Sequence, residues 1–101
     1  MKGNTLADFM NDLISAGGPE KEFAFRNTYF VLEAQWERQR QAAELRVDAY
    51  DNGTGKDKRF LQSYSFFGKD YAECASQFEK APLFDGMTIY EAEREIEVLF
   101  G

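Results

Sequence analysis

The stretch Asp51–Lys58, DNGTGKDK, places glycines beside a lysine, which are residue types of a phosphate-binding loop. Such a loop follows the pattern G-x-x-x-x-G-K-[ST] and leads from a strand into a helix, whose N-terminus faces the anion. Here Tyr50 stands where the first glycine belongs and Asp57 where a Ser or Thr belongs, and a strand-like segment follows. Asn-Gly between two alternating segments is a strong hairpin signal. We therefore predict a hairpin loop and no nucleotide site.

The other reactive side chains give little support to catalysis. The chain has no histidine, which removes the commonest general base and the commonest metal ligand. Its single cysteine, Cys74, lies on the apolar stripe of a predicted helix, where a free thiol is usually a small buried hydrophobe. A calcium-loop pattern around residues 51–57 lacks the required glycine and glutamate. We predict no catalytic, cofactor-binding or metal-binding residue, and a protein that is not an enzyme.

The net charge of −6 is unevenly distributed. Residues 1–68 hold 10 acidic and 9 basic side chains, whereas residues 69–101 hold 8 acidic and 3 basic ones. This balance disfavours direct nucleic-acid binding and leaves open a basic partner. An acidic face is expected at Glu91, Glu93, Glu95 and Glu97. One hypothesis is that these residues, with Asp85 and Glu79, imitate the phosphates of nucleic acid and inhibit a basic enzyme; the alternative is an ordinary solvated helix surface.

The N-terminal two thirds of the chain predicts one helix and four strands. Apolar residues at helical spacing predict a helix over 5–16, capped by Thr5 and ended by Gly17-Gly18-Pro19. Alternating side chains predict strands over 21–26, 29–37, 43–50 and 59–67. A competing interpretation makes the segment 34–46 a helix, because LEAQWERQRQAAEL is rich in helix-forming residues.

The C-terminal third predicts two helices. Asp70 is placed to cap the first, with Glu73 three residues on, and Pro82 ends it. After an Asp85-Gly86 turn, Thr88 is placed to cap a second helix, with Ile89, Ala92, Ile96 and Leu99 on its apolar face. The strict alternation of the four glutamates also suits a strand, and we expect the helix to become extended near Val98.

The predicted fold class is α+β, with residues 1–101 as a single domain: a helix, a four-stranded antiparallel meander, then two C-terminal helices packed on one sheet face. The face expected under the helices carries Phe23, Phe25, Phe30, Leu32, Trp36, Leu45 and Val47. The opposite face is expected to carry Tyr29, Val31, Arg46, Tyr50 and part of the set Phe60, Tyr64 and Phe66. The register of 59–67 is open, so that Phe60 and Phe66 could exchange faces with Leu61 and Phe67.

This aromatic second face has two interpretations. Either the third helix or the N-terminal segment covers it, or it binds a protein, since Tyr, Phe and Arg are enriched at interfaces. The interface would then comprise Tyr29, Tyr50, Tyr64, Phe66 and Arg46.

The order of segments also carries a resemblance. A short helix, then EFAFRNTYFVLEAQ, then a hairpin ending SYSFFGKDYAECASQF, then APLFDGMTIYEAEREI resembles small uncharacterised proteins of Firmicutes, often carried on mobile elements. The resemblance covers most of the chain as a pattern and implies no activity and no site residues.

The leading hypothesis is a small protein-interaction domain of unknown specific function, able to form a dimer, with a protein partner or a second copy on the aromatic face. No basic segment followed by an apolar run opens the chain, and its apolar runs are too short to span a membrane, so we expect a cytoplasmic protein without membrane contact.

Overall fold

The computed structural model describes residues 1–15, 20–51 and 58–101, which form an antiparallel sheet with helices packed on it. The strands are β1 (Glu20–Phe25), β2 (Thr28–Glu37), β3 (Ala42–Asp51), β4 (Arg59–Gly68) and β5 (Ile96–Phe100). Their order across the sheet is β4-β3-β2-β1-β5. The helices are α1 (Leu6–Ile14), α2 (Tyr71–Lys80), the short α3 (Ile89–Ala92) and the 3₁₀ turn η1 (Glu93–Glu95).

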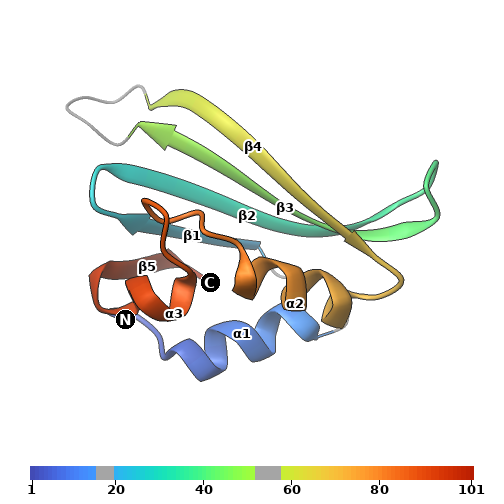
Figure 1. Cartoon of the computed structure of the whole chain (residues 1–101), viewed down its shortest axis with the longest axis horizontal. Coiled ribbons are helices and arrows are strands. Elements are labelled where there is room, and N and C mark those ends of the chain that lie inside the picture. The colour runs from blue at the N-terminus through green and yellow to red at the C-terminus, as the bar shows by residue number, and fades with distance from the viewer. Residues whose placement is uncertain (16–19, 52–57) are drawn as a thin grey trace.

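The helices α1, α2 and α3 lie on one side of the sheet (Figure 1). We call this side of the sheet the covered face and the opposite side the open face. Alternate residues of each strand point to the covered face, and there they meet the apolar stripes of the helices. The resulting core is aromatic. The ring of Phe84, in the segment between α2 and α3, contacts those of Phe23, Phe25, Phe30 and Phe78 at centroid distances of 5.2–6.5 Å.

The predicted helix at the N-terminus and the four-stranded meander are confirmed, with α1 ending at Ile14; Gly17-Gly18-Pro19, predicted to end the helix, lies outside the described residues. Thr5 caps α1 by accepting a hydrogen bond from the Asp8 backbone N–H at 3.2 Å. The competing helix over 34–46 is wrong, because β2 and β3 pair without interruption from Thr28↔Asp51 to Glu37↔Ala42. A tight turn joins β1 to β2, and Arg26 within it has a positive φ of 53°.

The N-terminal caps of α2 and α3 follow the sequence signals. Asp70 accepts a hydrogen bond from the Glu73 backbone N–H at 2.9 Å. The Glu73 carboxylate accepts from the Lys69 N–H, one residue before the position that a capping box predicts. At α3 the capping box is complete, because Thr88 and Glu91 each accept a hydrogen bond from the backbone of the other.

The final helix is shorter than predicted, although the expected extended backbone at Val98 is present. The α-helix ends at Ala92, and from Ile96 the chain becomes β5, which pairs antiparallel with β1 through Phe25↔Ile96 and Phe23↔Val98. The physical reason is that β1 would otherwise be an edge with unpaired backbone groups, and the alternation of the segment suits a strand. Leu99, expected on a buried helix face, is 52% exposed beside a register shift in β5. The described sheet therefore has five strands where four were predicted.

Two predictions about the faces of the sheet need correction. Trp36 was expected under the helices, but it lies near the far end of the β2–β3 hairpin, which extends past α2 (Figure 1), and is 53% exposed. The open face was expected to be covered by a helix or by the N-terminal segment if it was not an interface. Within the described residues no helix packs on it, because α1, α2 and α3 contribute their buried residues to the one core on the covered face.

Candidate interaction surfaces

The pairing of β4 with β3 decides which aromatic side chains share a face. Tyr64 pairs with Val47 and Phe66 with Leu45, whose side chains are buried on the covered face. Nearer the start of β4 the register shifts, so that Ala49 pairs with Gln62 but Tyr50 pairs with Phe60. Leu61 is the extra residue of this β-bulge. The bulge places Phe60 on the open face, although it has the same parity as Tyr64 and Phe66.

The open face therefore contains part of the predicted interface. Tyr29, Tyr50 and Arg46 lie on it, as expected. Tyr64 and Phe66 do not, because both pack against the core on the covered face, where Phe66 contacts the ring of Phe78 at 6.1 Å. Tyr64 and Phe66 therefore do not belong to the candidate interaction surface on the open face.

Three aromatic rings form a continuous row at one end of the open face. Tyr29 contacts Tyr50 at a centroid distance of 6.2 Å, and Tyr50 contacts Phe60 at 5.7 Å. The Lys58 ammonium lies 4.6 Å from the centre of the Tyr29 ring. Phe60 remains 55% exposed. We call Tyr29, Tyr50, Phe60 and Lys58 the aromatic end.

The middle of the open face is polar, and its side chains bind one another. Arg46 lies 2.9 Å from Glu33 and 3.4 Å from Asp48. Glu44, only 7% exposed, accepts hydrogen bonds from the Gln35 amide and the Ser65 hydroxyl, each at 2.8 Å. These contacts fix the middle of the face in one arrangement. The sequence contained no signal for this network beyond the alternation that places its members on one side.

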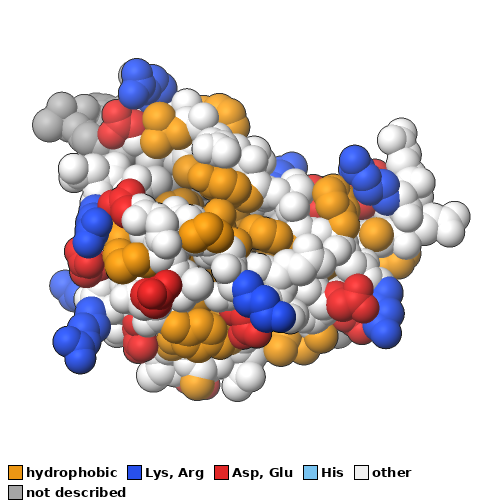
Figure 2. Space-filling model, in the orientation of Figure 1, with side chains coloured by type: hydrophobic (Ala, Val, Ile, Leu, Met, Phe, Trp, Pro, Cys, Tyr) orange, Lys and Arg blue, Asp and Glu red, His pale blue; other side chains and the backbone are white. Residues whose placement is uncertain are grey.

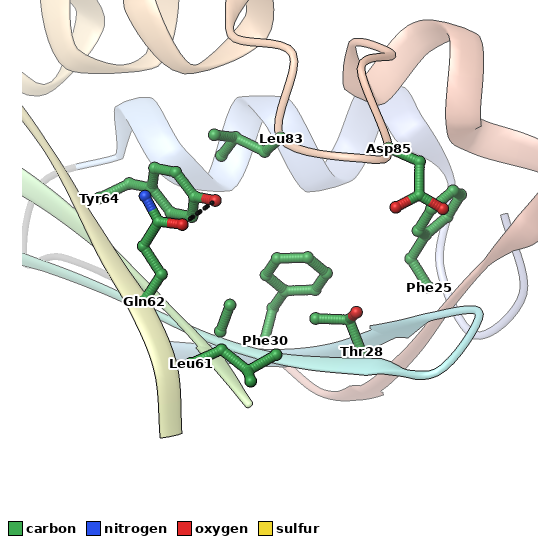
Figure 3. A pocket seen from close by; sticks show the side chains of 9 residues that line it. Phe25, Thr28, Phe30, Leu61, Gln62, Tyr64, Leu83 and Asp85 are labelled. Atoms are coloured by element: carbon green, nitrogen blue, oxygen red, sulfur yellow. Dashed lines mark hydrogen bonds between the residues drawn. The ribbon is translucent and has the colours of Figure 1, made fainter. Parts of the chain in front are cut away.

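A pocket of about 160 Å³ lies on the covered face, between the sheet and the segment that joins α2 to α3 (Figure 3). Phe30 and Ala49 line it from the sheet, and Leu83 and Asp85 line it from the connecting segment. Tyr64 donates a hydrogen bond to Gln62 at its margin. Figure 2, drawn in the orientation of Figure 1, shows hydrophobic side chains around a hollow in the middle of this face of the molecule. The volume corresponds to roughly five waters, below the usual size of a small-molecule site.

The four predicted acidic residues are present at the surface but do not share one helix. Glu91 lies in α3, Glu93 and Glu95 in η1, and Glu97 in β5. A charged or capping partner engages each of them. Glu95 lies against Arg26 at 2.8 Å, and Glu97 lies 3.2 Å from Lys2. Two hydrogen bonds from Arg26 hold the pKa of the Glu95 carboxyl below its usual range.

Arg26 also binds Asp85 at 2.8 Å, so this one guanidinium joins the β1–β2 turn to η1 and to the α2–α3 connection. Its pKa is raised by the hydrogen bonds to Glu95 and Asp85. Glu79, the remaining residue of the proposed nucleic-acid mimic, accepts a hydrogen bond from the Tyr90 hydroxyl, which raises the pKa of Tyr90.

One buried charged residue, Lys21, was not expected from the sequence. Lys21 takes the covered-face position two residues before Phe23 and is 1% exposed. Its ammonium lies 2.9 Å from Asp12 Oδ2 and 5.0 Å from the centre of the Phe9 ring. The sequence does contain a signal for this burial. Side chains at positions 21, 23 and 25 of a strand point to the same side, so Lys21 shares the covered face with Phe23 and Phe25.

Cys74 is buried and its Sγ donates to the Ala43 carbonyl oxygen at 3.4 Å. Burial raises the pKa of this thiol, which opposes formation of a reactive thiolate.

The prediction for the loop of residues 52–57 lies outside the described residues, although a strand, β4, follows it and pairs antiparallel with β3. In the described part of the chain, no three of the Cys, Asp and Glu side chains are grouped as metal ligands would be, and no helix is long and apolar enough to cross a membrane.

Comparisons with protein-family models, curated proteins and solved structures give no match to this chain.

Proposed function

We propose that this chain is a non-enzymatic protein-binding domain that receives a basic partner on its open face. The observation that carries the proposal is the aromatic end, where three rings lie on a sheet face that no described helix covers. Phe60 is exposed and Tyr29 and Tyr50 are half-buried. Accessible aromatic rings on a rigid sheet offer apolar area at low entropic cost, and Tyr in particular is enriched at interfaces. Burial of that area contributes roughly 25 cal/mol per Å² before the costs of association.

Charge indicates the chemistry of the partner. Acidic side chains outnumber basic ones among the open-face positions of the strands. The acidic ones are Glu20, Glu22, Glu33, Glu37, Glu44, Asp48 and Glu97; the basic ones are Arg46 and, just before β4, Lys58 of the aromatic end. A partner with an apolar side chain for the aromatic end and Lys or Arg beside it would match this pattern, and would associate faster at low ionic strength. A second copy placed face to face would instead bring like charges together.

Synthetic peptides provide a direct test. One set carries an aromatic or aliphatic anchor flanked by Lys and Arg, and a matched set carries Asp and Glu at the same positions. We expect the cationic set to bind and the anionic set not to bind, with affinity that falls as salt is added. The double variant Tyr50→Ser/Phe60→Ser should lose this binding. Tyr90→Ser is the matched control, because Tyr90 is an equally exposed aromatic residue on α3, away from the sheet face.

Two outcomes would contradict the proposal: failure of every cationic peptide to bind the folded protein, and equal binding by the double variant and by the control. The rival proposal, an acidic mimic of nucleic acid, has the net charge of −6 as its support. It would be favoured if a cationic protein bound the double variant as tightly as the control and lost binding when Glu91, Glu93, Glu95 and Glu97 were changed together to Gln.

A further inference from the structure

The two edges of the sheet differ in how the chain covers them. At β5, the N-terminal segment lies against the outer edge. The Lys2 N–H donates to the Ile96 carbonyl oxygen at 2.9 Å, and the Val98 N–H donates to the Lys2 carbonyl oxygen at 2.8 Å. At the opposite side, β4 has β3 as its one neighbour among the described strands. A free edge of this kind presents unpaired backbone donors and acceptors.

A single side chain covers one end of the β4 edge. The Gln77 amide of α2 donates to the Phe67 carbonyl oxygen at 2.6 Å, so this carbonyl points away from β3. Backbone groups alternate sides along an antiparallel strand. The N–H and C=O groups of Ser65 and Ser63 therefore point to the same outer edge as those of Phe67. No described strand pairs with them.

The composition of β4 sets it apart from the other strands. Its one charged side chain is Arg59 at its first position, so the nine residues from Phe60 to Gly68 form an uncharged run longer than any in β1, β2, β3 or β5. Soluble proteins usually protect a free edge with Lys, other charges or proline. The bulge at Leu61 interrupts the edge near its start, but it leaves the segment Gln62–Phe66 regular.

We infer that the β4 edge pairs antiparallel with β4 of a second copy of this chain. A two-fold axis through the edge would join the two sheets, and each copy would supply backbone donors to the acceptors of the other. A second copy suits this edge because two chains of charge −6 repel elsewhere, whereas the segment Phe60–Gly68 brings no like charges together. The small side chains of Ser63 and Ser65 allow the strands to approach. The open face keeps its aromatic end accessible in this arrangement, so the inference stands apart from the proposed function.

Substitutions at Ser63 test the pairing. Ser63→Pro removes an outward N–H, which an edge strand tolerates when that group faces solvent, and Ser63→Lys places a charge on the edge of each copy. Ser63→Ala is the matched control, because it also loses the hydrogen bond from Ser63 to Asp48 but keeps the backbone N–H. Circular dichroism verifies folding, and Ser63→Lys decides the test if the proline variant does not fold.

Sedimentation equilibrium from micromolar to millimolar protein gives the readout. We expect the wild type and Ser63→Ala to approach twice the mass of one chain, and Ser63→Pro and Ser63→Lys to weaken dimerisation by more than about tenfold. Amide hydrogen exchange should show protection of Ser63 and Ser65 that grows with protein concentration. A wild type that keeps the mass of one chain throughout would overturn the inference. So would a dimer that both edge variants retain, or one that Tyr29→Ser on the open face abolishes.

Discussion

The ammonium of Lys21 lies 2.9 Å from the Asp12 carboxylate and joins β1 to α1 under the sheet. The lysine side chain is buried, and its ammonium also donates to an oxygen of Gly101 at 2.9 Å. The carboxylate is about half exposed. The two partners therefore have unequal access to water, and the loss of each should have a different effect on stability.

Asp12→Asn should lower the free energy of unfolding by about 1–3 kcal/mol, because it leaves a buried cation without its counter-charge. The free energy of unfolding of Lys21→Met should stay within about 1 kcal/mol of the wild-type value, since a linear apolar side chain can fill the same space beside Phe9. Urea denaturation measures both. Glu97→Gln, which removes an exposed pair with Lys2, is the control and should cost less than about 0.5 kcal/mol. A larger loss for Lys21→Met than for Asp12→Asn would contradict this account.

Gly3→Ala should destabilise the covered edge of β5. Gly3 has φ +84°, and a Cβ there would lie 2.5 Å from the Val98 carbonyl oxygen, which is backbone and cannot move aside cheaply. Gly86 is a matched control with the same φ of +84° and no atom within 4 Å of an added Cβ. Gly86→Ala should cost about 1–2 kcal/mol for the left-handed backbone alone. Thermal denaturation should show a larger loss of stability for Gly3→Ala than for Gly86→Ala, and hydrogen exchange at the Val98 amide should be faster in Gly3→Ala. Equal losses of stability in the two variants would show that the contact with Val98 is unimportant.

Stability at acid pH should depend on Glu95. Its pKa is lowered in the folded chain by hydrogen bonds from Arg26, so the unfolded state binds the proton more readily. The stabilisation is therefore present above the unfolded pKa of about 4.3 and is lost as the pH falls through the lower folded value. Glu95→Gln should remove this part of the pH dependence and bring the unfolding curves at neutral and acid pH closer together. Unchanged acid sensitivity in the variant would assign the effect to other carboxylates.

Cys74 should react slowly with a thiol reagent while the chain is folded. Burial disfavours its thiolate and raises its pKa, and the side chain packs between α2 and the backbone of β3. Its reaction rate should rise with denaturant in parallel with unfolding, as followed by tryptophan fluorescence. Because the folded pKa is raised, the contribution of the thiol to stability is full below the unfolded pKa of about 8.5 and declines as the pH rises through the folded value. Rapid reaction of the native protein at neutral pH would show an accessible thiol and reopen a chemical role.

The sequence by itself determined the elements whose signals are local. The stripe of Phe9, Met10 and Leu13, the caps at Thr5, Asp70 and Thr88, and the Asp85-Gly86 turn each depend on neighbours a few residues away, and each occurs in the structure. The meander is equally local, because adjacent strands pair with the strand next in sequence. The α+β class follows from these elements.

Only the tertiary structure decided the features that depend on distant segments. The segment after Ala92 has a glutamate alternation compatible with both helix and strand, and the vacant edge of β1, far away in sequence, selects the strand. The bulge at Leu61 reverses the face of Phe60 relative to Tyr64, and no alternation pattern reveals an extra residue in a strand. The candidate surface changed for the same reason. Tyr29 and Tyr50 lie on it as predicted, Phe60 completes it, and Tyr64 and Phe66 leave it, because the side to which a strand residue points is fixed by its pairing with the neighbouring strand.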